Sequence, residues 1–161
     1  MIIAAPIIAV IVVLLLIYGP FGGNNLAPDF TLVDVQGRGQ FTLSEHQGEV
    51  VFIEFFSTTC SHCVDYHPTI QQIRTLFNTE ELTMISISVS WAHDEGPQVL
   101  EYAEEMGIRW FITLDTSSVT DLYDIGSTPT TIIVDKSGNI EFKRSGIISA
   151  STLRSEIEAL L

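Results

Sequence analysis

The chain has 161 residues, with 7 Lys and Arg against 20 Asp and Glu, which gives a formal net charge of −13. Such an acidic chain lacks the basic surface that neutralises phosphates, so nucleic acid is a poor candidate for a partner. Its two cysteines exclude a fold held by several disulfides, and its length suits one domain with an appended segment.

The first predicted element, residues 1–21, is a transmembrane anchor. Residues 2–21 carry no charge and are mostly apolar, and their length suits a helix that spans a bilayer. A core helix is disfavoured because the stretch has no polar face. A signal peptide is the alternative, but the stretch has no Lys or Arg at its start and no A-x-A-like cleavage site at its end. Residues 22–26 form a linker, and the domain comprises residues 27–161.

Residues 27–161 show the apolar patterns of one α/β domain. Strands are predicted at 30–35, 41–43, 50–56, 82–89, 130–135 and 140–144, helices after the cysteines and at 96–106, 119–123 and 150–161, and a short apolar segment at 110–114. Pro68 lies inside the first of these helices and predicts a kink near its start. Helices between the middle strands, followed by a terminal hairpin, predict a mixed central sheet with helices on both faces.

Cys60 and Cys63 lie two residues apart, where the apolar strand 50–56 ends and a helix begins. A helix N-terminus stabilises a thiolate, which is the reactive form of cysteine, and Cys63 follows one turn further along the same face, within reach of Cys60. A disulfide that closes so small a loop constrains the unfolded chain little, which favours a reactive role over a structural one. Cys60, Cys63 and His67 offer three metal ligands, but a closed zinc site takes four, so no metal is expected.

Glu54 is the one ionisable residue in the apolar strand 50–56. Burial in such a strand raises the pKa of a carboxyl, and buried carboxyls with a raised pKa gather at functional sites. Glu54 is therefore a candidate general base for Cys63, acting directly or through a water. The alternative is a strand carboxylate that reaches solvent or an Arg.

Three motifs together resemble the thioredoxin superfamily, and within it the TlpA/ResA-like group of membrane-tethered thiol-disulfide oxidoreductases. They are Ala-Pro-Asp-Phe-Thr-Leu at 27–32, the segment 51–63 with the two cysteines, and the segment 123–135 with Pro129. The resemblance covers residues 27–161, and an inserted strand and helix before Pro129 are typical of that group. It implies an enzyme without a cofactor, whose partners are protein thiols and disulfides and a redox partner protein, on a membrane-anchored domain that faces outside the cytoplasm.

The resemblance implies roles for particular residues. Cys60 would be the nucleophile, and Cys63 would resolve the mixed disulfide that Cys60 forms with a substrate. Glu54 matches the buried acid of thioredoxins, which helps to deprotonate the resolving cysteine. Pro129 is predicted in cis, which would hold the Thr128 backbone open for an extended substrate strand. The alternative for Pro129 is an ordinary proline at the entry of a strand.

The chain departs from that family at the residues around the nucleophile. The family often has Trp where this chain has Thr59, and Gly-Pro or Xaa-Pro where it has Ser61 and His62. A protonated His62 would stabilise a neighbouring thiolate and make the disulfide more oxidising, and the alternative is an exposed turn residue without a tuning role. The direction of electron transfer stays open. The residues interpreted mainly as packing or rim residues are Trp91, His93 and Trp110.

Two other functions stay open as alternatives. A peroxiredoxin shares the entry motif at 27–30, but that family has Pro-x-x-x-Thr-x-x-Cys where this chain has Ile53 and Ser57 in place of the Pro and the Thr. A Sco-type copper chaperone also uses two cysteines and a distant His. That group separates its cysteines by three residues, whereas this chain separates them by two.

Overall fold

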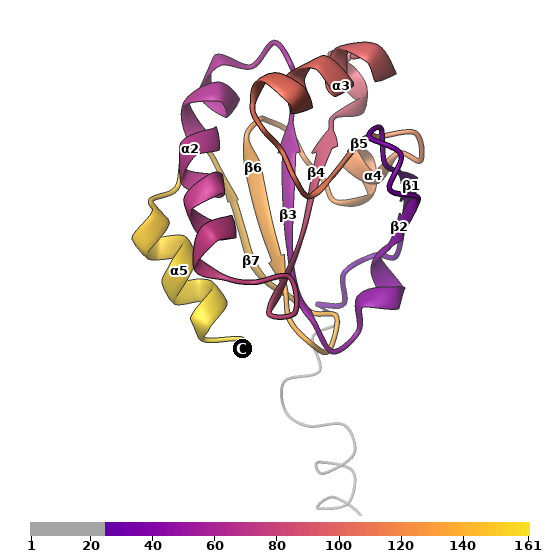
Figure 1. The fold of residues 1–161 in the computed structure, drawn as a ribbon. Coiled ribbons are helices and arrows are strands. Elements are labelled where there is room, and N and C mark those ends of the chain that lie inside the picture. Colours follow the sequence, from indigo (N-terminus) through magenta and orange to yellow (C-terminus); the bar gives the residue numbers. More distant parts are fainter. Residues whose placement is uncertain (1–24) are drawn as a thin grey trace, which may run out of the picture.

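The computed structural model describes residues 25–161, drawn in colour in Figure 1. Residues 1–24 lie outside the described residues, and with them the predicted anchor and most of the predicted linker. None of the helices in the described part has both the length and the apolar character that crossing a bilayer requires.

A five-stranded mixed sheet forms the centre of the domain, in the strand order β5-β4-β3-β6-β7 (Figure 1). Its strands are β3 (Val50–Phe56), β4 (Leu82–Ser88), β5 (Phe111–Leu114), β6 (Thr130–Val134) and β7 (Ile140–Ser145). β4 pairs parallel with β3, and β5 with β4, through crossover connections that contain helices. β6 pairs antiparallel with β3, and β7 with β6. The predicted mixed sheet is confirmed.

The central strand β3 is buried along its whole length, as its nearly unbroken apolar sequence requires. Successive side chains point to opposite faces of the sheet. Phe52 and Phe56 therefore pack into the core on one face, and Ile53 and Phe55 into the core on the other. By the same alternation, Glu54 points to the face of Phe52 and Phe56.

The two faces of the sheet are covered differently (Figure 1). The face of Glu54 packs against α2 (Ser61–Leu76), α3 (Gly96–Glu105) and α5 (Ala150–Glu158). The other face packs against the hairpin of β1 (Thr31–Val33) and β2 (Gln40–Thr42), the 3-10 helix η1 (Leu43–His46) and the short α4 (Val119–Leu122). Helices on both faces are thus confirmed, although the hairpin covers much of the second face.

The hairpin, the end of α3 and the proline of α2 are local features on which the sequence bears. The hairpin at the start of the domain is confirmed, and its Asp34 forms an isolated bridge to Thr113 of β5. α3 ends shortly before Gly107, whose φ of 66° is the left-handed conformation that terminates helices. α2 continues past Pro68 to Leu76, so the proline does not end this helix.

One end of the sheet gathers the segments of the candidate site. β3 ends at Phe56 and leads within a few residues into α2, and β4 ends beside it, with Ser88 opposite Phe56. β6 runs the other way, so its first residue, Thr130, lies opposite Phe55 at the same end. The topology therefore places the start of α2, the loop after β4 and the loop before β6 next to one another.

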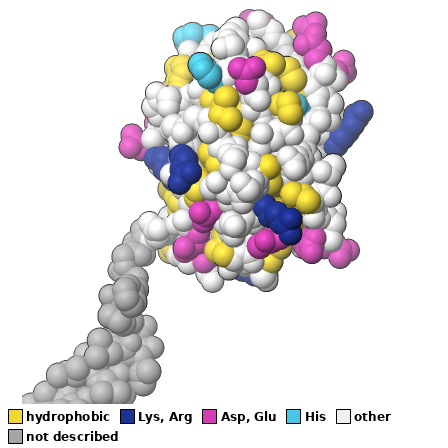
Figure 2. All heavy atoms as spheres, turned by 90° about the vertical axis from the view of Figure 1, so that its left-hand side faces the viewer, with side chains coloured by type: hydrophobic (Ala, Val, Ile, Leu, Met, Phe, Trp, Pro, Cys, Tyr) yellow, Lys and Arg dark blue, Asp and Glu magenta, His cyan; other side chains and the backbone are white. Residues whose placement is uncertain are grey.

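The surface over α2 and α5 reflects the acidic composition of the chain (Figure 2). Acidic side chains are spread over this face, and Lys and Arg occur in separate places among them. On this face of the described domain, the cations form no continuous stripe of the kind that follows a phosphate backbone.

Candidate active site

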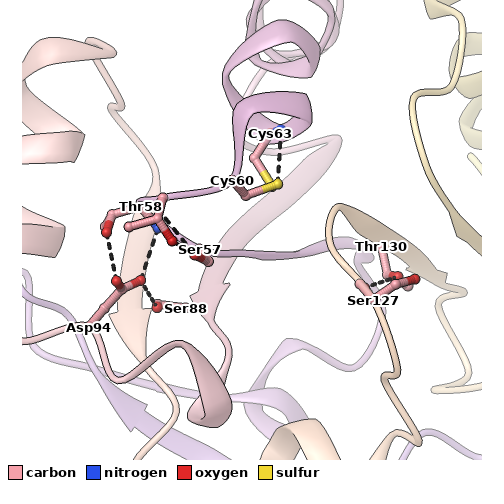
Figure 3. The surroundings of a disulfide bond; sticks show 9 residues. Ser57, Thr58, Cys60, Cys63, Ser88, Asp94, Ser127 and Thr130 are labelled. Carbon is pink, nitrogen blue, oxygen red and sulfur yellow. Dashed lines mark hydrogen bonds between the residues drawn. A yellow bond between two sulfur atoms is a disulfide. The ribbon is translucent and has the colours of Figure 1, made fainter.

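Cys60 and Cys63 form a disulfide at the N-terminus of α2, with their Cα atoms 5.2 Å apart (Figure 3). Cys60 is the N-cap residue of the helix, and the backbone N–H of Cys63 donates a hydrogen bond of 3.1 Å to its Sγ. The positive end of the helix dipole is thus directed at the Cys60 sulfur. After reduction of the disulfide, both effects would stabilise a thiolate on Cys60.

The two cysteines differ in exposure. Cys60 is partly exposed, whereas Cys63, in the first turn of α2, is fully buried. Ser61 and His62, which lie between them, are exposed. A thiolate on Cys60 can therefore meet the disulfide of another protein. Cys63 is placed to react with a sulfur that is already bound at Cys60.

Glu54 lies in the core on the sheet face that α2 covers, and 2% of its surface is exposed. Its Oε2 accepts a hydrogen bond of 2.6 Å from Oγ of Ser86, which faces it on β4. Burial raises the pKa of Glu54 to about 7, and the hydrogen bond from Ser86 opposes part of that rise. No ion pair within residues 25–161 includes Glu54, so it does not reach an Arg in the described domain.

The loop before β6 lies on one side of the disulfide in Figure 3. The Thr128–Pro129 peptide bond is cis, which confirms that prediction. The carbonyl of Pro129 accepts a hydrogen bond of 2.8 Å from the N–H of Gly146, and Oγ1 of Thr130 donates one of 2.7 Å to the carbonyl of Ser127. The backbone N–H and C=O of Thr128 have no hydrogen-bond partner within residues 25–161.

Asp94 belongs to the site as well, and the sequence did not indicate it. One of its carboxylate oxygens accepts hydrogen bonds from the Thr58 N–H at 2.9 Å and from Oγ of Ser88 at 2.6 Å (Figure 3). The other oxygen accepts one of 2.6 Å from Oγ1 of Thr58. Asp94 thus ties the loop ahead of Cys60 to the end of β4. An Asp just beyond the carboxyl end of a core strand is the signal that could have indicated it.

The remaining residues singled out by the sequence differ in exposure. His93 is exposed, and Trp91 is 43% exposed. His67 is buried below the cysteines on α2, where its Nε2 bonds the carbonyl of Met106 at 2.8 Å and its ring stacks on Trp110. Within the described residues, no group of three or more His, Cys, Asp or Glu side chains is close enough to hold a metal ion.

Comparison with known proteins assigns the chain to a family. A model of the AhpC/TSA family matches residues 24–143, a range that includes the whole site from Glu54 to Thr130. The chain belongs to the AhpC/TSA family. This membership agrees with the resemblance to redoxins that the sequence motifs indicate.

The curated relatives of this AhpC/TSA chain are named as redox proteins. The thiol-disulfide oxidoreductase ResA of Geobacillus thermodenitrificans is 26% identical over 138 residues, which are 85% of this chain and 77% of ResA. The thioredoxin-like protein YneN of Bacillus subtilis is 24% identical over 132 residues, which are 82% of this chain and 76% of YneN. The resemblance to the ResA-like group is confirmed, and the Cys60–Cys63 pair fits redox activity.

Solved structures match the fold of this AhpC/TSA domain. The thioredoxin-like superfamily protein SPOA0173 has a TM-score of 0.76 at 23% identity, over 84% of this chain and 95% of its own. The thiol:disulfide interchange protein of the thioredoxin family from Chlorobium tepidum has a TM-score of 0.75 at 23% identity, over 84% of this chain and 94% of its own. These matches confirm the predicted thioredoxin-like α/β fold.

We expect Asp94→Ala to loosen the loop ahead of Cys60. The change removes the acceptor of the Thr58 N–H and of Ser88, and should lower the free energy of unfolding by about 2 kcal/mol. Urea denaturation and amide exchange at Thr58 measure the effect. The control is His93→Asn, because His93 is exposed and its φ of 55° suits Asn, so a change below about 0.5 kcal/mol is expected. Equal losses in the two variants would contradict the role of Asp94.

We expect Glu54 to make the folded state less stable as pH rises. Its pKa is about 7 in the folded domain against an ordinary value of 4.5, so the folded state binds the proton more tightly than the unfolded state. The free energy of unfolding should therefore fall between pH 4.5 and pH 7 by roughly 3 kcal/mol relative to Glu54→Gln. Urea denaturation of the oxidised proteins across this range measures the difference. Parallel pH dependences in the two proteins would contradict a buried, titrating Glu54.

Proposed function

We propose that this protein is a thiol-disulfide oxidoreductase that exchanges disulfides with other proteins. The observation that carries the proposal is the Cys60–Cys63 disulfide at the start of α2, with one cysteine accessible and the other buried. Membership of the AhpC/TSA family and the relatives named ResA support the same class of reaction.

The proposed reduction of a substrate proceeds in two exchanges. The Cys60 thiolate attacks one sulfur of a substrate disulfide, forms a mixed disulfide and releases the other substrate sulfur as a thiolate. The Cys63 thiol then loses its proton, and its thiolate attacks the Cys60 sulfur. This second exchange forms the Cys60–Cys63 disulfide and releases the second substrate thiolate, so two electrons pass from the protein to the substrate. A redox partner protein with a dithiol then reduces the Cys60–Cys63 disulfide by the same two kinds of exchange and is itself oxidised. Run in this direction with a substrate dithiol in place of the partner, the exchanges would oxidise the substrate.

In this proposal Glu54 accepts the proton that Cys63 loses. Glu54 points to the same face of the sheet that the buried Cys63 packs against, and its raised pKa lets it change protonation state near neutral pH. A thiol in an apolar core ionises poorly without such a base, because burial disfavours the thiolate. Glu54 would therefore be the proton acceptor that the buried Cys63 thiol needs in order to form a thiolate.

The substrate strand is proposed to pair with the backbone of Thr128, beside the cis Pro129. The free N–H and C=O of Thr128 support this, because an extended peptide needs such a donor and acceptor. Ser61 and His62 are proposed to tune the couple. His62 is exposed in the first turn of α2, and its protonated form would add positive charge near the Cys60 thiolate and raise the reduction potential.

We infer that residues 1–21 anchor the protein in a membrane, that residues 22–26 link the anchor to the domain, and that the domain faces outside the cytoplasm. The support is the uncharged apolar character of residues 2–21 and the reaction itself, because disulfides persist outside the cytoplasm. Protease added to intact cells that produce the full chain should digest the domain. Protection of the domain until the cells are lysed would contradict the orientation.

Variants of the two cysteines test the reaction. With a disulfide-bonded protein as substrate, Cys63→Ser should accumulate a mixed disulfide through Cys60, because the resolving sulfur is missing. Cys60→Ser should form no adduct and lose turnover, because Cys63 is buried. Non-reducing gel electrophoresis and mass spectrometry identify the adducts. Adducts through Cys63 in Cys60→Ser, or reduction of hydrogen peroxide faster than of any protein disulfide, would overturn the proposal.

A further inference from the structure

Three buried side chains, two from neighbouring strands and one from the residue just before a third strand, form a hydrogen-bonded chain that ends on Glu54. Nε1 of Trp110 donates to Oγ of Ser86 at 2.9 Å, and Oγ of Ser86 donates to Oε2 of Glu54 at 2.6 Å. Trp110 is 6% exposed and Ser86 is 0% exposed, so water does not compete for these bonds. Trp110 precedes β5, Ser86 belongs to β4 and Glu54 to β3.

The direction of this chain is set by the number of protons that each group carries. The indole nitrogen of Trp110 can only donate, and the hydroxyl of Ser86 has a single proton. Ser86 therefore accepts from Trp110 and directs its own proton at Oε2 of Glu54. If the carboxyl carried its proton on Oε2, the Ser86 hydroxyl would lose its acceptor in a closed core, which is costly.

The second oxygen of Glu54 is in a different situation. Oε1 accepts no hydrogen bond from residues 25–161, and it is not among their fully enclosed polar atoms without a partner. Oε1 therefore holds the small solvent contact that Glu54 retains. It is the oxygen that can exchange a proton with a thiol or a water.

We propose that Ser86 and Trp110 are positioning residues that reserve Oε2 of Glu54 as a permanent acceptor and so direct proton uptake to Oε1. The proposal rests on the proposed role of Glu54 as the base for Cys63. In the resolving step, the proton leaves the Cys63 sulfur and arrives at Oε1, directly or through one water. The carboxyl returns to the anion when that proton passes on to solvent. Ser86 keeps its hydrogen bond in both states, so the core does not rearrange during the cycle.

The other titratable groups around this chain do not replace the two positioning residues. Tyr66 from α2 and Tyr102 from α3 lie near enough to feel the charge of Glu54, and burial raises the pKa of both phenols, which keeps them neutral. Tyr66 bonds the hydroxyl of Thr131 at 3.0 Å instead of Glu54. His67 stacks on Trp110, and burial lowers the pKa of its ring. No ion pair of the described domain brings a cation to Glu54.

The experiment compares Ser86→Ala and Trp110→Phe in the full chain by two readouts. The first is the pKa of Glu54, followed by carbon NMR of labelled carboxyls and assigned with Glu54→Gln. The second is the pH profile of the resolving step, measured as single-turnover loss of the mixed disulfide. Ser86→Ala should raise the pKa of Glu54 by about one unit, because the anion loses its donor. At pH 7 the resolving step should then slow about fivefold and recover at alkaline pH, as a base with that shift requires.

Trp110→Phe keeps the aromatic ring that stacks on His67 and deletes the N–H. Without that donor, the Ser86 hydroxyl can also turn to accept a hydrogen bond from a protonated Oε2, which raises the pKa of Glu54. The rise should be smaller than in Ser86→Ala, because the hydroxyl can still donate to the Glu54 anion. Ser86→Thr restores a hydroxyl and should return both readouts close to the parent values. The matched control is Thr113→Val, which also removes a buried hydroxyl from the sheet but one that bonds the carbonyl of Val33. It should leave both readouts unchanged.

The outcomes separate this proposal from the proposed function. If Ser86→Ala leaves the pKa and the profile unchanged while Glu54→Gln abolishes the pH dependence, Glu54 is the base but the positioning proposal is wrong. If Glu54→Gln leaves the profile of the resolving step unchanged, the role of Glu54 as the base is wrong, whatever its pKa. A Thr113→Val shift as large as that of Ser86→Ala would also overturn the positioning proposal, because any lost hydroxyl would then have the same effect.

Discussion

The burial of one carboxyl in the middle of the central strand is the constraint on which this structure depends. Every other residue of β3 is apolar, and the whole strand is buried. A charge on Glu54 in such a core is costly without a cation beside it. The described domain supplies a hydroxyl from Ser86 and no cation. The carboxyl therefore holds its proton up to near neutral pH, and the domain loses stability as the pH rises toward that value.

The surroundings of the disulfide are held from both sides while the reacting sulfur stays accessible. Asp94 fixes Thr58 ahead of the helix, and the hydrogen bond between Gly146 and Pro129 fixes the loop before β6. Neither contact uses a residue of α2. The helix N-terminus can then stabilise the Cys60 thiolate without moving the surfaces between which a substrate would lie.

The sequence predicted those parts of the site that are encoded by local pattern. The apolar run of β3, the spacing of Cys60 and Cys63, and the motif around Pro129 each lie within a short segment. Asp94 and Ser86 were missed because their partners are distant along the chain: Thr58 lies 36 residues from Asp94, and Glu54 lies 32 residues from Ser86. The register of β3 against β4 places Ser86 opposite Glu54, and the apolar pattern of one sequence does not specify that register. The contact between Thr58 and Asp94 joins two loops beyond these strands, whose paths the apolar pattern does not specify either.

The hydrogen bonds from Thr58 to Asp94 make the Cys60–Cys63 site depend on two separate segments of the chain. The loop ahead of Cys60 owes its shape to a carboxylate from a different crossover, so a short peptide with the same cysteine spacing would not reproduce the site. Lengthening the connection after β4 would detach that carboxylate even though no residue near the cysteines had changed. Transplanting this redox centre into another scaffold would therefore mean carrying over two chain segments and the strand pairing between them.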